Sequence, residues 1–370
     1  MDYIVDVNAH MHTPYSFSAF TDVRQALDMA AQEGVRVVGI NDFYSLDGYQ
    51  EWSEECARHR LYPLFNIEMI ALNSEDQAKG LRVNDPNNPG RTYLSGKGLA
   101  FPIVLSGKEA RQLAEVKAES NAQVAKMCAK LNEVLNEVKA GFNIDFEEVR
   151  RKLTCGNIRE RHLAKAIRLA VSGHLDSEQA QLDFYERLCK KPLKSALDNV
   201  AAVENELRSN LLKAGGAAFV PEDAKAFLPL ETVQRIMEAA GGIPTYPFLA
   251  DDAKGNFTDF EADLQQCADT LKRRGIRSAE FITTRNTTAV LESYAGYLED
   301  EGFIVTFGSE HNTPAMEPIR LRTRDNAVLS EKLRAINFRG ACMVAAHQAG
   351  KQTAEEGAEI ISTRIGLDLI

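Results

Sequence analysis

The first hundred residues alternate between strand-like and helix-like segments, and this alternation restricts the fold more than any other feature of the chain. Three apolar runs, at residues 3–9, 35–40 and 61–72, are separated by two segments with helical spacing of their apolar residues, 21–33 and 46–60. Consecutive parallel strands need such crossovers because the chain must return to the same edge of the sheet, and the crossovers are right-handed. The sequence therefore predicts a βαβαβ unit with a parallel sheet.

The same alternation returns near the other end of the chain, after a long helical block. Residues 74–102 are rich in turn residues, and we expect a long functional loop there. Residues 108–240 are rich in Lys, Glu, Ala and Leu, and the periodic run at 108–140 contains no Pro or Gly. Strand-like runs at 241–247, 277–283 and 303–307 follow. We predict an α/β, TIM-like barrel made of residues 1–106 and 241–370, with residues 107–240 inserted as a helical lobe.

Composition limits the partners of such a fold. The chain has 43 Lys and Arg against 53 Asp and Glu, a formal net charge of -10, which argues against a nucleic-acid surface and against adhesion to an anionic membrane. We find no basic leader followed by an apolar segment, and no apolar run long enough for a membrane span. The six Cys are scattered without a C-x-x-C pair. We expect a cytoplasmic protein with reduced thiols, and an oligomer stays open.

The first apolar run ends in the pair His10 and His12. Side chains at positions i and i+2 of a strand point to the same side, so both imidazoles should converge where the strand ends. The carboxyl ends of barrel strands carry metal and catalytic groups, and imidazole is the commonest metal ligand. A hydrogen-bonded surface pair is the alternative interpretation of this motif on its own.

Polar residues gather at other strands as well. Two further runs end in polar groups: Asn41-Asp42 and Glu310-His311-Asn312. Glu68 lies inside an apolar run, where a lone carboxylate is costly unless it is paired or bound to metal. A mixed set of His and carboxylate ligands suits Zn²⁺, Mn²⁺ or Fe. The sequence therefore predicts a metal centre that activates water and polarises a phosphoryl oxygen.

Taken together, these segments resemble the motifs of the polymerase-and-histidinol-phosphatase (PHP) family of metal-dependent phosphoesterases. The matching segments are His10-Met11-His12-Thr13-Pro14-Tyr15-Ser16, Gly39-Ile40-Asn41-Asp42, Arg161-His162-Leu163-Ala164 and Gly308-Ser309-Glu310-His311, and Glu68 matches the metal-bridging glutamate of that family. The resemblance spans most of the chain and implies a distorted (β/α)7 barrel with up to three metals. It implies metal ligands at His10, His12, Glu68, His162 and His311, and catalytic roles for Asp42, Arg161 and Glu310.

The chain also departs from the family pattern. Phe17 stands where the family has an acid, Phe43 where it has a His, and Tyr246 where a His-Pro pair is expected. The last His position falls on Asn312 unless His311 shifts in register. We therefore expect a reduced site with one or two divalent ions, with Phe17 and Phe43 packing where ligands would stand.

Several candidate residues have a simpler alternative. Asp42 serves equally well to cap a turn or to orient a ligand. His162 fits a helix-surface histidine, His311 fits a loop hydrogen-bonding residue, and Arg161 fits a solvated charge. These alternatives stay open at the level of the sequence.

Two functions fit these observations. The first is a metal-dependent phosphoesterase that acts on a small phosphorylated metabolite through a metal-activated water, with an Arg stabilising the charge that develops. The second is a catalytically inactive PHP-like barrel that binds a metabolite as a regulatory protein, because fold does not determine function. A polymerase-associated exonuclease is disfavoured by the net charge. We also expect the lobe to cover the metal pocket and to bring His162 to its edge.

Overall fold

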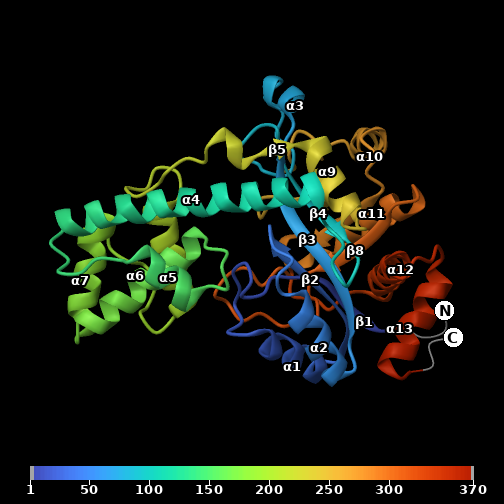
Figure 1. Ribbon diagram of the computed structural model, residues 1–370, viewed down its shortest axis with the longest axis horizontal. Helices are drawn as coiled ribbons and strands as arrows, with labels where there is room; N and C mark the ends of the chain where they lie inside the picture. Colours follow the sequence, from blue (N-terminus) through green and yellow to red (C-terminus); the bar gives the residue numbers. More distant parts are fainter. Residues whose placement is uncertain (1–3, 368–370) are drawn as a thin grey trace.

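The amino-terminal βαβαβ unit is present in the computed structural model, which describes residues 4–367 (Figure 1). Its elements are β1 (Asp6–Met11), α1 (Val23–Gln32), β2 (Val35–Phe43), α2 (Tyr49–His59) and β3 (Tyr62–Leu72). β1 pairs with β2, and β2 with β3, in parallel. Asp22 caps α1 by accepting a hydrogen bond from the Gln25 N–H. Tyr3, which belongs to the predicted first strand, lies outside the described residues.

Residues 74–102 contain a helix and a strand, so the prediction of a long loop was wrong there. The elements are α3 (Ser74–Ala78) and β4 (Arg91–Lys97). β4 pairs antiparallel with β3 and with β6 (Ile243–Phe248), so the sheet is not parallel throughout. The turn-rich stretch 84–90 reverses the chain so that β4 can return alongside β3. β4 itself includes Ser95, Gly96 and Lys97, residues that weaken a strand signal in the sequence.

The strands form an almost closed barrel. β6 is followed by β7 (Ser278–Ile282) and β8 (Ile304–Gly308), and these three strands pair in parallel. The strand order is β1-β2-β3-β4-β6-β7-β8, with the short β5 (Leu228–Pro229) beside β3. Beyond β8, Glu310 forms a parallel bridge with Met11, and the N–H groups of Ser309 and Glu310 donate to the His10 carbonyl at 3.1 and 3.0 Å. These contacts join the last strand to the first.

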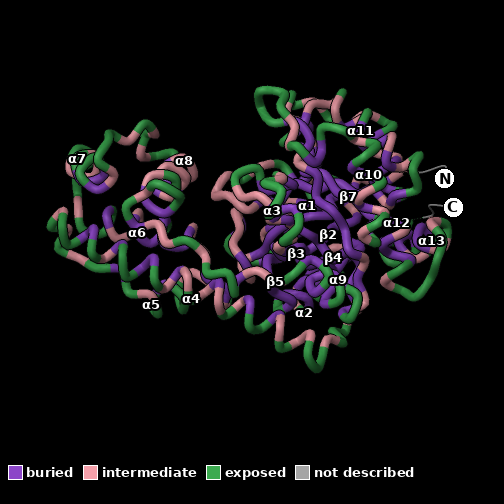
Figure 2. The backbone as a smooth tube through the Cα atoms, turned by 90° about the horizontal axis from the view of Figure 1, so that it is seen from above, coloured by how far each residue is buried: buried purple, intermediate pink, exposed green. Residues whose placement is uncertain are grey.

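Helices surround the barrel and bury its outer surface (Figure 2). They are α1 and α2, already described, and α9 (Leu230–Ala239), α10 (Leu264–Arg273), α11 (Thr288–Asp300), α12 (Glu331–Gln348) and α13 (Ala354–Ile365), with a 3₁₀ turn at Thr283–Arg285. The main barrel cluster includes Phe65, Phe281 and Phe307. A smaller cluster, with Val7 and Phe338, packs α12 and α13 against the start of β1 and β2.

The helical lobe has a hydrophobic core of its own. Its elements are α4 (Gly107–Glu137), α5 (Phe146–Leu153), α6 (Glu160–His174), α7 (Glu178–Cys189) and α8 (Val200–Leu207), followed by a π turn at Arg208–Leu212 and a 3₁₀ turn at Ala224–Ala226. α4 runs from the barrel into the lobe (Figure 1): Leu113 and Val116 pack in the barrel cluster, whereas Val124 and Leu131 pack in the lobe cluster.

The lobe cluster extends from Val124 to Ala218. The apolar residues of α9 belong to the barrel cluster, although α9 lies inside the predicted lobe range 107–240. The boundaries of the lobe stay a prediction. Within residues 4–367, no helix combines the length and the apolar character needed to cross a bilayer, α4 included.

Candidate metal centre

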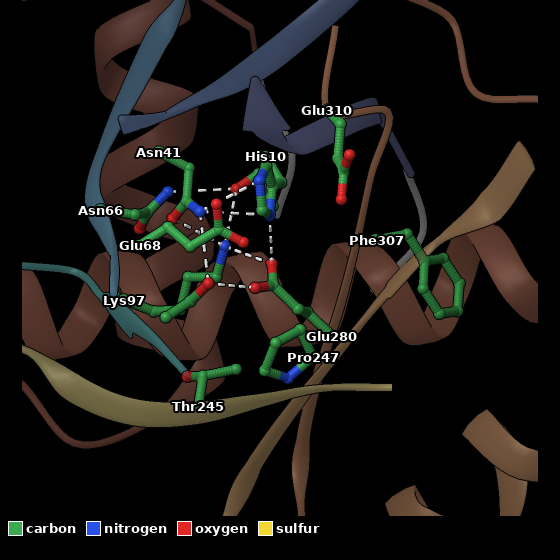
Figure 3. Close-up of polar contacts among 12 residues, drawn as sticks. His10, Asn41, Asn66, Glu68, Lys97, Thr245, Pro247, Glu280, Phe307 and Glu310 are labelled. Carbon is green, nitrogen blue, oxygen red and sulfur yellow. Dashed lines mark hydrogen bonds and ion pairs between the residues drawn. The ribbon is translucent and has the colours of Figure 1, made fainter. Parts of the chain in front are cut away.

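His10, at the end of β1, and His12, directly after it, converge with Glu68 of β3 inside the barrel. The Nε2 atoms of the two imidazoles are 3.4 Å apart, and His12 Nε2 lies 3.4 Å from Glu68 Oε2. One ligand atom from each residue falls within 4.8 Å of the others, and all three residues are buried. In Figure 3, His10 and Glu68 point toward the same space from their two strands.

The spacing of these three atoms fits a divalent metal ion. Zinc–nitrogen bonds are about 2.0–2.1 Å long, so two nitrogens on a tetrahedral ion lie about 3.3–3.4 Å apart. The observed distances of 3.4 Å match that separation. Three protein ligands with an open fourth position are also the donor count of catalytic zinc sites.

Both imidazoles are held in the tautomer that a metal ligand needs. His10 Nδ1 donates to Glu280 Oε2 at 3.0 Å. His12 Nδ1 lies 3.1 Å from Ser16 Oγ, and Ser16 gives its own proton to Asp42 Oδ1 at 2.5 Å, so His12 is the donor. The Nε2 atoms of both rings therefore carry the lone pair, and that of His10 also has the Asn41 amide nitrogen 3.1 Å away.

Electrostatics in this space favour a bound cation. Burial, aided by the neighbouring His10, lowers the pKa of His12 well below its usual value, which keeps the ring in the neutral form that binds metal. Burial and the charges of Glu310 and Glu280 raise the pKa of Glu68. In the part of the chain that the structure describes, no Lys or Arg forms an ion pair with Glu68. Its carboxylate thus lacks the positive partner that a metal would provide.

Asp42 lies behind His12 and does not face the three ligand atoms. Its two oxygens accept hydrogen bonds from the Thr13 N–H at 2.7 Å, the Thr13 hydroxyl at 2.5 Å and the Ser16 hydroxyl. Burial raises its pKa to about 6 against the opposing effect of these bonds. The catalytic role predicted for Asp42 does not fit these contacts, whereas the alternative of an orienting residue does.

The backbone after β8 sends Glu310 and His311 in different directions. Both residues have positive φ, 66° and 55°, a conformation that non-glycine residues adopt at a cost. The Glu310 carboxylate points toward the barrel interior (Figure 3) and pairs with Arg285 Nη2 at 2.5 Å. His311 has both ring nitrogens engaged, with Ser309 Oγ at 2.6 Å and the Glu317 carbonyl at 2.9 Å. These contacts fit the alternative interpretation of His311, a loop hydrogen-bonding residue, and its ligand role stays a prediction.

A cavity of about 230 Å³ lies between the barrel mouth and the lobe. The barrel contributes Phe17 and Asn312 to its lining, and the lobe contributes Arg161, His162 and Lys165. The Phe17 ring stacks on His12, with centroids 5.4 Å apart and planes 16° apart, so one aromatic ring separates the cavity from a candidate ligand. The Arg161 guanidinium lies 5.5 Å from the centre of the same ring.

His162 lines this cavity but is not part of the converging group. Its Nδ1 accepts a hydrogen bond from the Arg159 N–H at 2.9 Å at the start of α6, which places the ring proton on Nε2. Burial, with Lys165 nearby, lowers its pKa to about 4, so the ring is neutral. A ring with its free nitrogen protonated donates hydrogen bonds, so the ligand role predicted for His162 does not fit this geometry.

Three aromatic residues stand where the family pattern has other residues, and all three pack against their neighbours, as expected for Phe17 and Phe43. Phe43 lies beneath the Arg159 guanidinium, 4.4 Å from the ring centre. Tyr246 is fully buried and donates its hydroxyl proton to Glu261 Oε1 at 2.8 Å. None of these positions offers a ligand atom to the centre.

Glu280 and Lys97 are central residues that sequence analysis missed. Both are fully buried, and Lys97 Nζ lies 2.5 Å from Glu280 Oε2. Glu280 stands alone among the apolar residues of β7, the same signal that singled out Glu68. Lys97 ends β4, a strand that the sequence analysis did not predict.

Comparisons with known proteins agree on the fold. No protein-family model and no curated protein matches the sequence. Among solved structures, the chain is similar to a protein from Bifidobacterium adolescentis described as a candidate metal-dependent phosphoesterase, with 17% identity, a TM-score of 0.56, and coverage of 89% of this chain and 94% of that one. An amidohydrolase from Chromobacterium violaceum, solved with sulfate and without metal, has 16% identity, a TM-score of 0.57, and coverage of 90% and 96%. The chain therefore shares its barrel fold with these two proteins.

Proposed function

We propose that this chain is a metal-dependent phosphoesterase of the PHP type that hydrolyses a small phosphorylated metabolite. The observation that carries the proposal is the buried group of His10, His12 and Glu68, whose donor atoms have the spacing of a metal site. The motif resemblance supports the phosphoester chemistry. The barrel shared with a candidate metal-dependent phosphoesterase and with an amidohydrolase supports a hydrolytic reaction.

Each part of the site has a role in this reaction. A divalent ion held by the three residues would supply a Lewis acid and lower the pKa of a water molecule. His10 and His12 keep their Nε2 atoms aimed at that position through Glu280 and Ser16. Glu310, held by Arg285 at the rim, accepts the proton of the attacking water.

The cavity beside the centre selects the substrate. Burial lowers the pKa of Arg161 to about 10, so it remains a cation, and its buried Nε lacks a hydrogen-bond partner among the described residues. Arg161 and Lys165 therefore attract an anionic group, and His162 supplies a neutral donor. A volume of about 230 Å³ favours a small metabolite over a polymer.

A second candidate is the regulatory barrel that binds a metabolite without hydrolysing it. The aromatic residues at Phe17, Phe43 and Tyr246 favour it, because they reduce the number of groups that could hold metal. Bound metal together with phosphatase turnover supports the first candidate over the second.

Elemental analysis combined with a phosphatase screen tests the proposal. The purified protein should contain a divalent metal and release phosphate from a small phosphorylated compound, and a chelator should abolish the release. The double variant His10→Ala/His12→Ala should lose most of its metal while keeping its fold by circular dichroism. His174→Ala/His347→Ala, two exposed helix histidines, is the matched control and should keep both metal and activity. Unchanged metal in the first double variant would rule out the site.

The assignment of the cavity is tested with Arg161→Met. Losing the guanidinium should raise the KM for a phosphorylated substrate about tenfold, with metal content unchanged, because Arg161 lines the cavity and not the centre. Arg187→Met, a substitution on α7 away from the cavity lining, should leave KM unchanged. An unchanged KM in Arg161→Met would remove the cavity from the substrate site.

A further inference from the structure

We propose that the Lys97 ammonium is a built-in cation that fills a second cation position beside the His10–His12–Glu68 group, and that it limits the centre to one divalent ion. The inference rests on the metal centre proposed above and adds its stoichiometry. It concerns residues of β1, β2, β4 and β7 that meet inside the barrel (Figure 3).

Lys97 reaches from the end of β4 into the barrel and has no exposed surface. Its Nζ lies 2.5 Å from Glu280 Oε2, 3.1 Å from the Ala9 carbonyl and 3.3 Å from Asn41 Oδ1. An ammonium group has three protons and here it has three acceptors, one of them a carboxylate. A carboxylate, an amide oxygen and a backbone carbonyl are also the donor types that hard metal cations take in proteins. The ammonium thus occupies an all-oxygen cation position.

The surroundings of Glu280 leave it no free atom for a metal. Its Oε2 accepts from both Lys97 and His10 Nδ1, and its Oε1 accepts from the Ser95 hydroxyl. Asn41 Nδ2 donates in turn to Ser95 Oγ at 3.2 Å. Glu280 is therefore a positioning residue that holds His10, and Lys97 compensates its charge.

The charge balance of the buried groups permits one divalent ion and opposes a second. Glu68, Glu280 and Lys97 together carry one negative charge when all three are ionised, and the charge of the neighbouring Glu310 is balanced by its ion pair with Arg285. One divalent ion changes this to one positive charge, and a second ion would raise it to three. Burying uncompensated charge in a barrel interior is strongly unfavourable, and a second ion near Glu280 would meet the ammonium at close range.

Metal stoichiometry tests the inference directly. The protein is incubated with excess Zn²⁺, and in a second series with Mn²⁺, then desalted and measured by native mass spectrometry and elemental analysis. The wild type should hold one ion per chain. Lys97→Met removes the ammonium but keeps the length of the side chain, and it should hold two ions because three oxygen acceptors lose their cation.

Two control variants separate this effect from general damage. Lys97→Met/Glu280→Gln lacks both the ammonium and the carboxylate, so it should return to one ion. Lys117→Met removes a lysine that pairs with Asp47 near the surface, and it should stay at one ion. Circular dichroism and the melting temperature report whether each variant folds.

The outcomes separate this inference from the proposed function. Two or more ions in the wild type overturn the inference, and so does a folded Lys97→Met protein that stays at one ion. If Lys97→Met does not fold, Lys97→Arg takes its place: it keeps a cation, so a second ion there overturns the inference and one ion supports it. No bound ion in the wild type overturns both this inference and the metal centre. One bound ion without phosphatase turnover defeats the proposed function and leaves the stoichiometry standing.

Discussion

At the scale of single residues, the hydrogen bonds of the Nδ1 atoms orient the His10 and His12 rings so that their Nε2 atoms face the metal position. His10 is held by Glu280, and His12 is held by Ser16, which Asp42 orients in turn. Partners of this kind determine the tautomer and the ring orientation of a ligand before the metal arrives. The affinity of the centre should therefore depend on residues that never touch the ion.

Ser16→Ala tests this dependence. The variant removes the acceptor for the His12 Nδ1 proton and leaves Asp42 without one of its donors. Zinc affinity should fall about 10–100-fold while the fold is retained. Isothermal titration with Zn²⁺ measures the change, and Ser172→Ala on the exposed surface of α6 should match the wild type. An unchanged affinity in Ser16→Ala would show that Ser16 does not orient His12.

Glu261 gives a pH dependence that is independent of the metal centre. It is buried between the Tyr246 hydroxyl and the N–H groups of Leu249 and Ala250. Burial raises its pKa to about 7, against these hydrogen bonds. The folded state therefore holds this proton more tightly than the unfolded state does. The contribution of this proton to the stability of the folded protein is complete below the pKa of Glu261 in the unfolded chain. It is lost as the pH rises through the pKa of Glu261 in the folded protein.

We expect the unfolding free energy of the wild type, relative to Glu261→Gln, to fall by about 2–3 kcal/mol between pH 5 and pH 8. The Gln side chain does not titrate, so the difference between the two proteins isolates this one group. Urea denaturation at several pH values measures it. A difference that stays constant with pH would mean that Glu261 titrates normally.

At the scale of elements, the site depends on a close approach between β1 and β8. A Cβ added at Gly308 would overlap the Cβ of His10, so only glycine allows the end of β8 to pass this close. The two residues after it, Ser309 and Glu310, bond to the His10 carbonyl and fix the position of the backbone that carries the ligand.

Gly308→Ala should accordingly weaken metal binding as well as stability. The overlap must be relieved by moving β8 or the His10 backbone, and overpacking of this kind costs about 1–3 kcal/mol. Gly173→Ala, on α6 with no neighbour near the added Cβ, is the matched control and should be neutral or slightly stabilising. Thermal melts and zinc titration of both variants check the expectation; equal behaviour of the two would contradict it.

At the scale of the whole molecule, the sequence predicted the barrel and its helical insertion because period and length distinguish strands from helices. It missed β4, whose Gly, Ser and Lys residues follow a stretch of turn residues. The convergence of His10 and His12 followed from their spacing of two. The orientation of His311 could not be predicted, because no feature of the sequence indicates a positive φ angle at the non-glycine residues Glu310 and His311. Glu280 carried the same signal as Glu68, but it needed Lys97 and His10 as partners to be interpreted.

The division of α4 between two cores has a consequence for how the molecule melts. The first part of this helix packs in the barrel cluster and the rest packs in the lobe cluster. The two cores are therefore two cooperative units, linked by α4 and by the returning segment 213–229. Calorimetry should resolve two transitions, and Zn²⁺ should raise only the one that belongs to the barrel, because only that unit contains its ligands. A single transition that moves as a whole with Zn²⁺ would contradict this.

If the lobe is the less stable unit, heating would remove the lobe side of the cavity before it disrupts the centre. Arg161, His162 and Lys165 would be lost from the cavity while His10, His12 and Glu68 stayed in place. On heating, the protein would then stop binding the anionic substrate at a lower temperature than the one at which it loses the metal.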